Sequence, residues 1–371
     1  MGPPARAPGA TRQGIALALA AAGLFGLSVP CSKLLLGEMS PVLVAGLLYC
    51  GAGAGMSAVT VLASRRGSEG RLGRKDIPWL AGAVLTGGVA GPVLLMWGLA
   101  STPASSTALL LNLEGVFTAA LAWFVFRENF DWRIALGMVL IIAGGIVLAR
   151  PPGGGFALPA GALAVAGAAL CWAIDNNLTQ KVSGADPLRI AAIKGVVAGI
   201  VNVVLALGLG ARMPSAGLSA GALIVGLLGY GISLSLFVAA LRHLGTARTA
   251  AYFSAAPFIG AVAALVMLDE PLRPELSAAA LLMGLGIRLH LTERHDHVHE
   301  HGALAHDHRH RHDEHHEHPH GPDDPPGDPH AHPHVHARVI HGHPHYPDIH
   351  HRDHPHRARR PESPGRMMSA R

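Results

Sequence analysis

Between Gly14 and Leu291 the chain is a succession of ten apolar stretches, and this succession limits what the chain can fold into. A helix needs about 20 predominantly apolar residues to cross the hydrocarbon core of a bilayer. Only 14% of the residues are charged, whereas a soluble globular domain carries about 25%. The alternative, a soluble α/β protein with long buried helices, would require regular charged faces, which the stretches lack. The sequence therefore predicts an all-α membrane protein with ten transmembrane helices. The predicted helices cover residues 14–36, 41–63, 77–100, 104–126, 132–149, 158–180, 188–210, 220–241, 246–268 and 275–291.

The positive charges of the short loops predict the orientation in the membrane, because cytoplasmic loops carry an excess of Lys and Arg. If the N-terminus is cytoplasmic, the outer loops carry only Arg150, Arg212 and Arg273. The inner loops then carry Arg65, Arg66, Arg71, Arg74, Lys75, Arg127, Lys181, Arg242 and Arg248. Ten crossings return the C-terminus to the same side. We therefore expect a multi-pass protein of the cell (inner) membrane with both termini in the cytoplasm.

The apolar region contains an internal repeat. A shift of 142 residues carries Arg127-Glu128 onto Asp269-Glu270, and Thr107-Ala108 onto Thr249-Ala250. Each half has five apolar stretches, and an odd number forces the second half to insert upside down. Such inverted repeats are typical of secondary transporters, which bind substrate near the midplane between the halves. The predicted units are a cytoplasmic N-terminus (1–13), two five-helix repeats (14–149 and 158–291) and a tail (292–371).

These repeated residues, followed in the first half by a Gly-rich helix from Gly137 to Gly145, resemble the EamA-type carriers of the drug/metabolite transporter superfamily. The resemblance covers about residues 14–291 and implies a carrier rather than an enzyme, with no required cofactor. It leaves the substrate open, because the superfamily handles amino acids, sugars, nucleotides, drugs and other metabolites. One departure is Gly115, where the family usually has Pro in the fourth helix; Pro257 keeps that residue in the second half. The sequence also lacks P-loop, GxSxG, HExxH and strand–helix GxGxxG motifs, which argues against an enzyme or an ATP-driven pump.

Glu114 is the sharpest candidate for a functional residue. It lies about 10 residues into the fourth stretch, or about 15 Å down a helix and close to the midplane. An ionisable residue at that depth is costly unless it is paired or hydrated. Its counterpart in the second half is Ala256, so the repeat does not explain it. We expect a proton-coupling carboxylate or a ligand for a cationic group; the alternative is a neutral Glu hydrogen-bonded to Asn112 or to a facing helix.

A second polar group lies nearer the cytoplasmic end. Asp175, Asn176 and Asn177 are about six residues from that end of the sixth stretch, and Lys194 is about six residues into the seventh. Adjacent antiparallel helices place Asp175 and Lys194 at a similar depth, where they are expected to neutralise each other. The pair is either structural or a gate opened by substrate or a proton.

Other residues of the apolar region are candidates for secondary roles. Aromatic residues that could line a substrate cavity, or serve packing and interfacial anchoring instead, are Tyr49, Trp97, Trp172, Tyr230 and Tyr252. Prolines that could unwind a helical turn beside it are Pro30, Pro92 and Pro257. Lys33 is expected to extend to the membrane interface. Glu128 and Glu270, at helix ends, are expected to be structural, pairing with Arg127, Arg133 or loop donors.

Histidine is concentrated in the tail: 24 of the 25 His residues lie at or beyond His290. The tail has no segment able to build a core and is predicted to be disordered. Alternating imidazoles on a flexible chain suit zinc, nickel or copper ions. The candidate ligands are His295, His297, His299, His301, His306, His308, His310, His312, His315, His316, His318 and His320. Two alternatives remain: a polyelectrolyte that gains positive charge below about pH 6.5, or a segment without a role.

Together these features predict a secondary active transporter, more specifically an exporter, that moves a small polar metabolite by alternating access. Proton coupling through Glu114, with facilitative transport as its alternative, and metal binding by the tail are part of this hypothesis. One alternative is a divalent metal cation carrier, which the scarcity of ligands in the apolar region disfavours. Another is a membrane-anchored metal buffer or sensor. The expected partners are the lipid bilayer, a small-molecule substrate, protons and divalent metal ions, with no nucleic acid.

Overall fold

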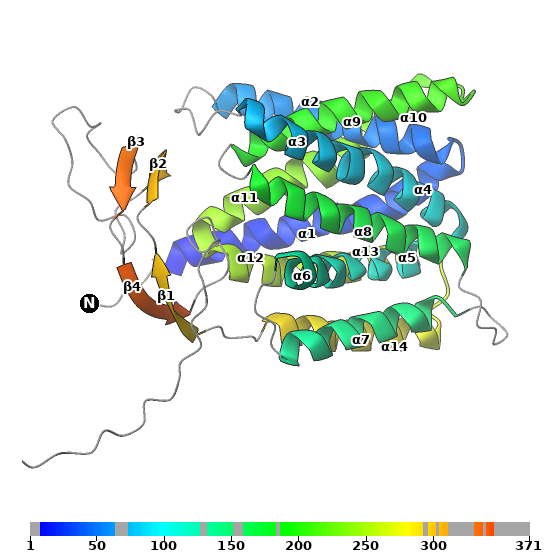
Figure 1. Cartoon of the computed structure of the whole chain (residues 1–371). Coiled ribbons are helices and arrows are strands. Elements are labelled where there is room, and N and C mark those ends of the chain that lie inside the picture. Colours follow the sequence, from blue (N-terminus) through cyan, green and yellow to red (C-terminus); the bar gives the residue numbers. More distant parts are fainter. Residues whose placement is uncertain are drawn as a thin grey trace, which may run out of the picture. The chain divides into compact units, whose positions relative to one another are not determined.

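The computed structural model describes residues 8–63, 73–126, 132–150, 159–182, 186–291, 296–301, 304–310, 330–336 and 339–344. The chain forms two compact units, a helical body (Met1–Glu293) and a tail (Arg294–Arg371). In the body the helices lie side by side as a bundle (Figure 1). They are α1 (Pro8–Leu36), α2 (Pro41–Ala63), η2 (Arg74–Asp76), α3 (Ile77–Ala83), η3 (Val84–Ala90), α4 (Gly91–Ser101), α5 (Ala104–Leu110), α6 (Leu113–Phe126), α7 (Trp132–Leu148), α8 (Ala160–Lys181), α9 (Pro187–Gly208), α10 (Ala216–Gly226), η4 (Leu227–Ile232), α11 (Ser233–Leu244), α12 (Thr246–Phe253), α13 (Ala256–Met267) and α14 (Pro274–Leu291).

Each predicted apolar stretch overlaps one helix or one run of consecutive helices. Among the described residues, seven helical spans are long and apolar enough to cross a membrane, and α7 is apolar but shorter. The helix α8 is not among the seven, and the polar run Asp175-Asn176-Asn177 lowers its hydropathy. The body is therefore that of a multi-pass membrane protein.

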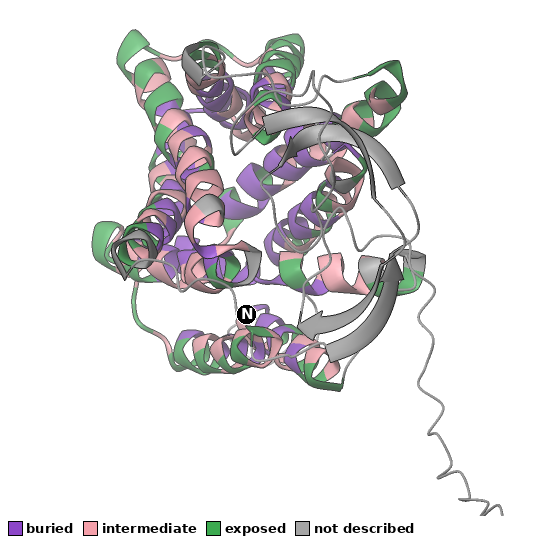
Figure 2. Cartoon of the chain, turned by 90° about the vertical axis from the view of Figure 1, so that its left-hand side faces the viewer, coloured by how far each residue is buried: buried purple, intermediate pink, exposed green. Residues whose placement is uncertain are grey.

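The outer surface of the body is apolar. Large side chains such as Phe124, Val204, Val266 and Leu281 are exposed, and Val266 reaches 78% exposure. Buried residues lie toward the inside of the bundle and exposed ones toward the outside (Figure 2). A soluble protein rarely exposes so much contiguous apolar surface, so this surface is suited to lipid.

The fourth and ninth predicted helices are both broken, at positions related by the repeat. The break between α5 and α6 includes Asn112, and a shift of 142 residues carries it onto Ser254, between α12 and α13. Asn112 Nδ2 donates to the Leu109 carbonyl at 2.9 Å, and Ser254 Oγ donates to the Ala251 carbonyl at 2.7 Å. Each polar side chain thus bonds a carbonyl at the break, in competition with the helical pattern.

The third and eighth predicted helices each contain a π-helical turn, η3 and η4. The same shift of 142 residues carries Gly87 of η3 onto Gly229 of η4. An added Cβ at Gly87 would overlap the Asp175 carboxylate, and one at Gly229 would lie 2.6 Å from Ser28 Cβ. Glycine is therefore required at both turns by the close approach of a neighbouring helix. Turns of this kind often occur at functional sites.

Pro92 and Pro257 behave alike, whereas Pro30 differs from them. Pro92 and Pro257 lie in the first turn of α4 and of α13, directly after an irregular segment. The expectation that Pro30 unwinds a turn is wrong, because α1 continues through it as α-helix.

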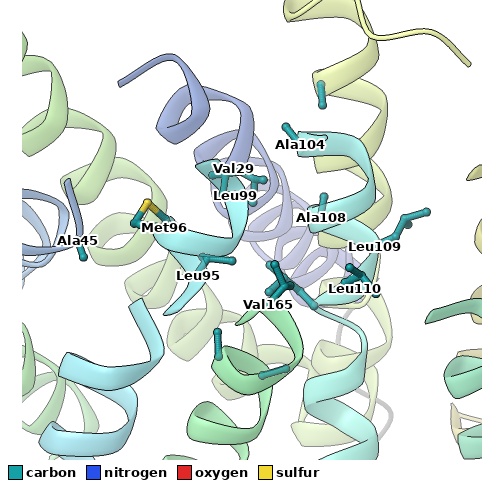
Figure 3. Packing of buried hydrophobic residues seen from close by; sticks show 14 of the residues in the cluster. Val29, Ala45, Leu95, Met96, Leu99, Ala104, Ala108, Leu109, Leu110 and Val165 are labelled. Atoms are coloured by element: carbon teal, nitrogen blue, oxygen red, sulfur yellow. The ribbon is translucent and has the colours of Figure 1, made fainter. Parts of the chain in front are cut away.

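Small residues bring the helices of the body into close contact. Val29 of α1, Ala45 of α2, Leu99 of α4, Ala108 of α5 and Val165 of α8 belong to one buried cluster (Figure 3). Between α2 and α9, an added Cβ at Gly195 would lie only 2.7 Å from Gly53 Cα. In a membrane, where lipid is as apolar as Leu, such close packing replaces the hydrophobic effect as the source of helix association.

The helices α7 and α14 form an antiparallel pair that packs mainly against itself. An added Cβ at Gly286 would lie 2.6 Å from the Gly137 carbonyl oxygen, so the two backbones nearly touch. The ring Nε2 of His290 lies 3.1 Å from the Ile134 carbonyl and joins the pair near the end of α14. In Figure 1 the pair lies along the lower edge of the bundle.

The tail differs from the expectation of disorder over four short strands. The strand β1 (Asp296–His301) pairs antiparallel with β4 (Val339–Pro344), and β2 (Leu304–His310) pairs antiparallel with β3 (His330–His336). Alternation of His with other residues has the period of two that a strand requires. The all-α prediction therefore applies to the body and not to these segments.

Candidate substrate site

A charged pair joins α8 to α9 inside the bundle. Lys194 Nζ lies 2.5 Å from Asp175 Oδ1 and 2.6 Å from Oδ2. Thr179, one turn after Asp175, donates to Oδ1 at 2.9 Å and orients the carboxylate. Both charged side chains are largely buried, with 17% of Lys194 and 10% of Asp175 exposed. The pair expected from helix depth is thus formed, and each charge offsets the other.

The carboxylate of Asp175 packs against the π-helical turn η3, whose free carbonyls have side-chain partners. Tyr49 OH and Trp172 Nε1 both donate to the Gly87 carbonyl, at 2.8 and 2.9 Å. Asn202 Nδ2 donates to the Gly88 carbonyl at 3.0 Å. Donors from α2, α8 and α9 therefore converge on one irregular turn, which holds the wall of the site in position.

Glu114 lies beside this group, in the first turn of α6. A carboxylate is stabilised there by the unpaired N–H groups of a helix N-terminus. Asn176 Nδ2 donates to Glu114 Oε1 at 2.8 Å and connects α8 to α6. Asn176 is exposed, and a Cβ added at Gly115 would meet no atom within 4 Å. The residue that follows Glu114 in the chain therefore borders open space.

Aromatic rings extend from the polar group across the bundle. Tyr49 and Tyr230 have ring centroids 5.7 Å apart, and Tyr230 meets Phe25 edge to face at 5.8 Å. Phe253 continues the series, 5.7 Å from Phe25 and 4.9 Å from Phe237. The candidate site thus combines two carboxylates and an ammonium with a neighbouring apolar, aromatic surface.

Comparison with known proteins decides the family. The family model of the EamA-like transporter family matches the chain twice, over residues 12–150 and 159–292. The chain belongs to the EamA-like transporter family. This EamA-like transporter is 32% identical to an uncharacterized transporter of Methanothermobacter thermautotrophicus over 266 residues, 67% of this chain and 77% of the relative.

Two further similarities are more limited. A segment of 107 residues, 27% of this chain, is 35% identical to 36% of a protein of Streptantibioticus cattleyicolor named a probable terminal-alkyne amino-acid exporter. One crystal structure of a protein superposes with a TM-score of 0.57 at 17% identity, covering 76% of this chain and 95% of its own. The latter similarity shows the shared fold alone.

In this EamA-like transporter the candidate site lies where the two matched repeats meet. Glu114, Tyr49 and Gly87 belong to the first repeat, whereas Asp175 and Asn176 belong to the second. The contacts between Asn176 and Glu114, and between Trp172 and Gly87, therefore cross the repeat boundary. The chain is a transporter of a family without enzymatic activity.

Several residues predicted for the site lie elsewhere. Asn112 is buried and faces Met283 of α14, so it is not the partner of Glu114. Asn177 donates to the Ala173 carbonyl of its own helix. Tyr252 packs against the cluster that contains Ala18 and Leu244. Trp97 is 54% exposed, with no hydrogen bond or ring contact recorded among the described residues.

Four residues of the group were not singled out from the sequence. Thr179 and the glycine pair Gly87-Gly88 looked like ordinary components of membrane helices. Asn202 offered a signal, because an amide in the middle of an apolar helix needs a partner. It is fully buried, and its Nδ2 finds that partner in η3.

The other end of the body has its own polar arrangement. Lys33, expected to extend to the interface, donates to the carbonyls of Ala100 and Thr102 at 3.1 and 3.0 Å, at the end of α4. Glu270 accepts from the backbone N–H of Ala104 at 2.7 Å and of Ser105 at 3.0 Å, at the start of α5. The turn between α4 and α5 is thus held from both sides, which agrees with the expected pairing of Glu270 with loop donors.

The candidate metal ligands are only partly within the described residues. No group of three or more His, Cys, Asp or Glu side chains is positioned for a metal ion in the part of the chain whose side chains are described. The backbone of β1 and β2 includes His297, His299, His301, His306, His308 and His310. Outside the described residues lie His295, His312, His315, His316, His318 and His320, together with Arg127 and Glu128.

Proposed function

We propose that this EamA-like transporter is a secondary active exporter of a small polar metabolite that carries an ammonium group. The observation that carries the proposal is the contact between Glu114 of one repeat and Asn176 of the other, next to open space at Gly115. A carboxylate in that position can accept a charge-assisted hydrogen bond from an ammonium group.

The transport cycle we propose is alternating access between two inverted five-helix repeats, with ten membrane crossings and both termini in the cytoplasm. The paired helix breaks at Asn112 and Ser254, and the paired π-helical turns η3 and η4, support it. Discontinuous helices at corresponding positions of two repeats are typical of transporters that bind substrate between them.

The substrate class we favour is that of amino acids and related amines. Glu114 supplies negative charge for an ammonium group. The name of the Streptantibioticus cattleyicolor relative, an amino-acid exporter, supports the same class and the direction of transport.

Proton coupling is assigned to Glu114 within this proposal. The charge of Asp175 is already offset by Lys194 at 2.5 Å, whereas the recorded partner of Glu114 is a neutral amide. An ionisable residue inside a membrane that is not part of an ion pair is a candidate for a proton relay. Binding of a proton and of an ammonium group at Glu114 would then exclude each other, which couples their movements.

For the tail we propose binding of zinc, nickel or copper ions. Its strand register supports this, because His306 is opposite His334 and His308 is opposite His332. The backbone register therefore brings two possible ligands to the same point of the strand pair. The second candidate function is a divalent-cation carrier, and the His residues of the tail are the feature that favours it.

The experiment is flux into proteoliposomes with an imposed pH gradient, using a panel of labelled amino acids, a sugar, a nucleotide and Zn²⁺. Flux of at least one amino acid above that of empty vesicles, without flux of Zn²⁺, supports the proposal. Flux of Zn²⁺ alone contradicts it and favours the metal carrier.

A further inference from the structure

A groove of about 520 Å³ runs along the outside of the α7–α14 pair and shares no residue with the candidate substrate site. It is lined by Trp132, Arg133, Leu140, Leu285, Arg288 and Leu289. No member of this set is acidic. Arg288, Arg133 and Leu285 are exposed, so the groove opens to the surroundings of the bundle.

The groove has a charged end and an apolar interior. Arg133 is in the first turn of α7 and Arg288 is in the last turn of α14, and the two helices are antiparallel, so both guanidinium groups belong to the same end. Leu140 follows Arg133 by seven residues, which is two helical turns or about 10 Å deeper. Leu285 precedes Arg288 by three residues and lies on the same helix face.

The charged end and the apolar interior of the groove match the head group and the acyl chain of one phospholipid molecule. Arg presents several N–H donors in a planar fork that fits phosphate oxygens, and the leucines below offer a surface for an acyl chain. Trp132 is 65% exposed at the charged end, where Trp side chains favour the head-group region. The guanidinium of Arg133 lies 5.8 Å from the centre of the Trp132 ring.

We propose that this groove is a binding site for a phospholipid with an anionic head group. The head group binds Arg133 and Arg288, and the first part of an acyl chain covers Leu140, Leu285 and Leu289. A second copy of the chain is a poorer occupant. A two-fold contact through this face would bring the Arg pair of one copy against the same pair of the other. The bound lipid would also stabilise the α7–α14 pair, which packs mainly against itself.

The test is native mass spectrometry of the full chain in detergent, titrated with phosphatidylglycerol or phosphatidylcholine. The groove variant is Arg133→Gln/Arg288→Gln. The matched control is Arg74→Gln/Arg189→Gln, which removes the same charge from two exposed residues outside the groove. A third variant, Leu140→Trp, keeps both guanidinium groups but fills the apolar part of the groove.

The wild-type chain should bind one phosphatidylglycerol molecule in preference to phosphatidylcholine. The groove variant should lose this preference by about 10- to 30-fold, as expected for two basic residues at a lipid head group. The control should retain the preference, and Leu140→Trp should weaken phosphatidylglycerol binding.

Three results would overturn the proposal. They are equal losses in the two double variants, no head-group preference in the wild type, and dimers that become more abundant when Arg133 and Arg288 are replaced. The first indicates diffuse attraction, the second an unspecific apolar surface, and the third an interface between copies. None of these results bears on substrate transport, so the two proposals are tested separately.

Discussion

Glu114 accepts a hydrogen bond from Asn176 at 2.8 Å and so links the first EamA repeat to the second beside open space at Gly115. One residue along α8, Asp175 is paired with Lys194 of α9. A single segment of α8 therefore contacts both the neighbouring repeat and its own. A change in the charge of Glu114 would act directly on the contact between the repeats, as the proposed alternating access requires.

The Asp175–Lys194 pair should behave as a buried ion pair. Asp175→Asn and Lys194→Met each leave one charge unpaired, which typically costs about 3–5 kcal/mol. The double variant removes both charges and should therefore be more stable than either single variant. Thermal unfolding in detergent, followed by size-exclusion chromatography, measures the order of stability of the three variants. A double variant less stable than both single variants would contradict this account of the pair.

Gly87 should not tolerate a side chain. In Gly87→Ala the added Cβ overlaps the Asp175 carboxylate, and overpacking of this kind typically costs about 1–3 kcal/mol. Gly115→Ala is the matched control, because its Cβ meets no atom within 4 Å. The apparent Tm should fall for Gly87→Ala and stay near that of the wild type for Gly115→Ala. Equal Tm values for the two variants would show that η3 is not constrained by Asp175.

Glu270 should stabilise the start of α5. Glu270→Gln removes the charge that accepts from the N–H groups of Ala104 and Ser105, and loss of an N-terminal cap costs about 1 kcal/mol. Glu275→Gln changes an exposed carboxylate in the first turn of α14 and is the control. The apparent Tm should be lower for Glu270→Gln than for Glu275→Gln, and the reverse order would refute the capping role.

The tail should bind Zn²⁺ in a manner that depends on pH. Neutral imidazole is the ligand, so binding should be present at pH 7.5 and lost as pH falls below the ordinary His pKa of about 6.5. Equilibrium dialysis compares the full chain with a version ending at Arg294. Zn²⁺ binding that survives the truncation would place the metal site in the helical body instead.

The sequence predicted helix positions well, because a bilayer imposes an apolar length that can be counted directly. The segment 41–63 coincides with α2, and the end at Leu291 coincides with that of α14. The break near Ser254 was anticipated only through the expectation that Pro257 unwinds a turn. The break near Asn112 was not predicted, since a side-chain hydrogen bond at the break leaves the apolar pattern unchanged.

The site was predicted in part for a similar reason. Helix depth alone brought Asp175 to Lys194, and the rarity of charge in a membrane singled out Glu114. The depth of a residue in the membrane does not give the rotation of its helix about the helix axis. The sequence therefore could not show that the partner of Glu114 is Asn176 and not Asn112. The same limit applies to Asn177 and Tyr252, which face other partners.

The most direct test of the central claim is transport by Glu114→Gln in proteoliposomes, with the substrate identified from the flux panel. Glutamine keeps an oxygen that can accept from Asn176 but removes the charge, so the variant should fold and elute like the wild type. We predict that its proton-driven flux falls to the level of empty vesicles. Full activity in a well-folded Glu114→Gln protein would contradict the assignment of proton coupling and substrate binding to this carboxylate.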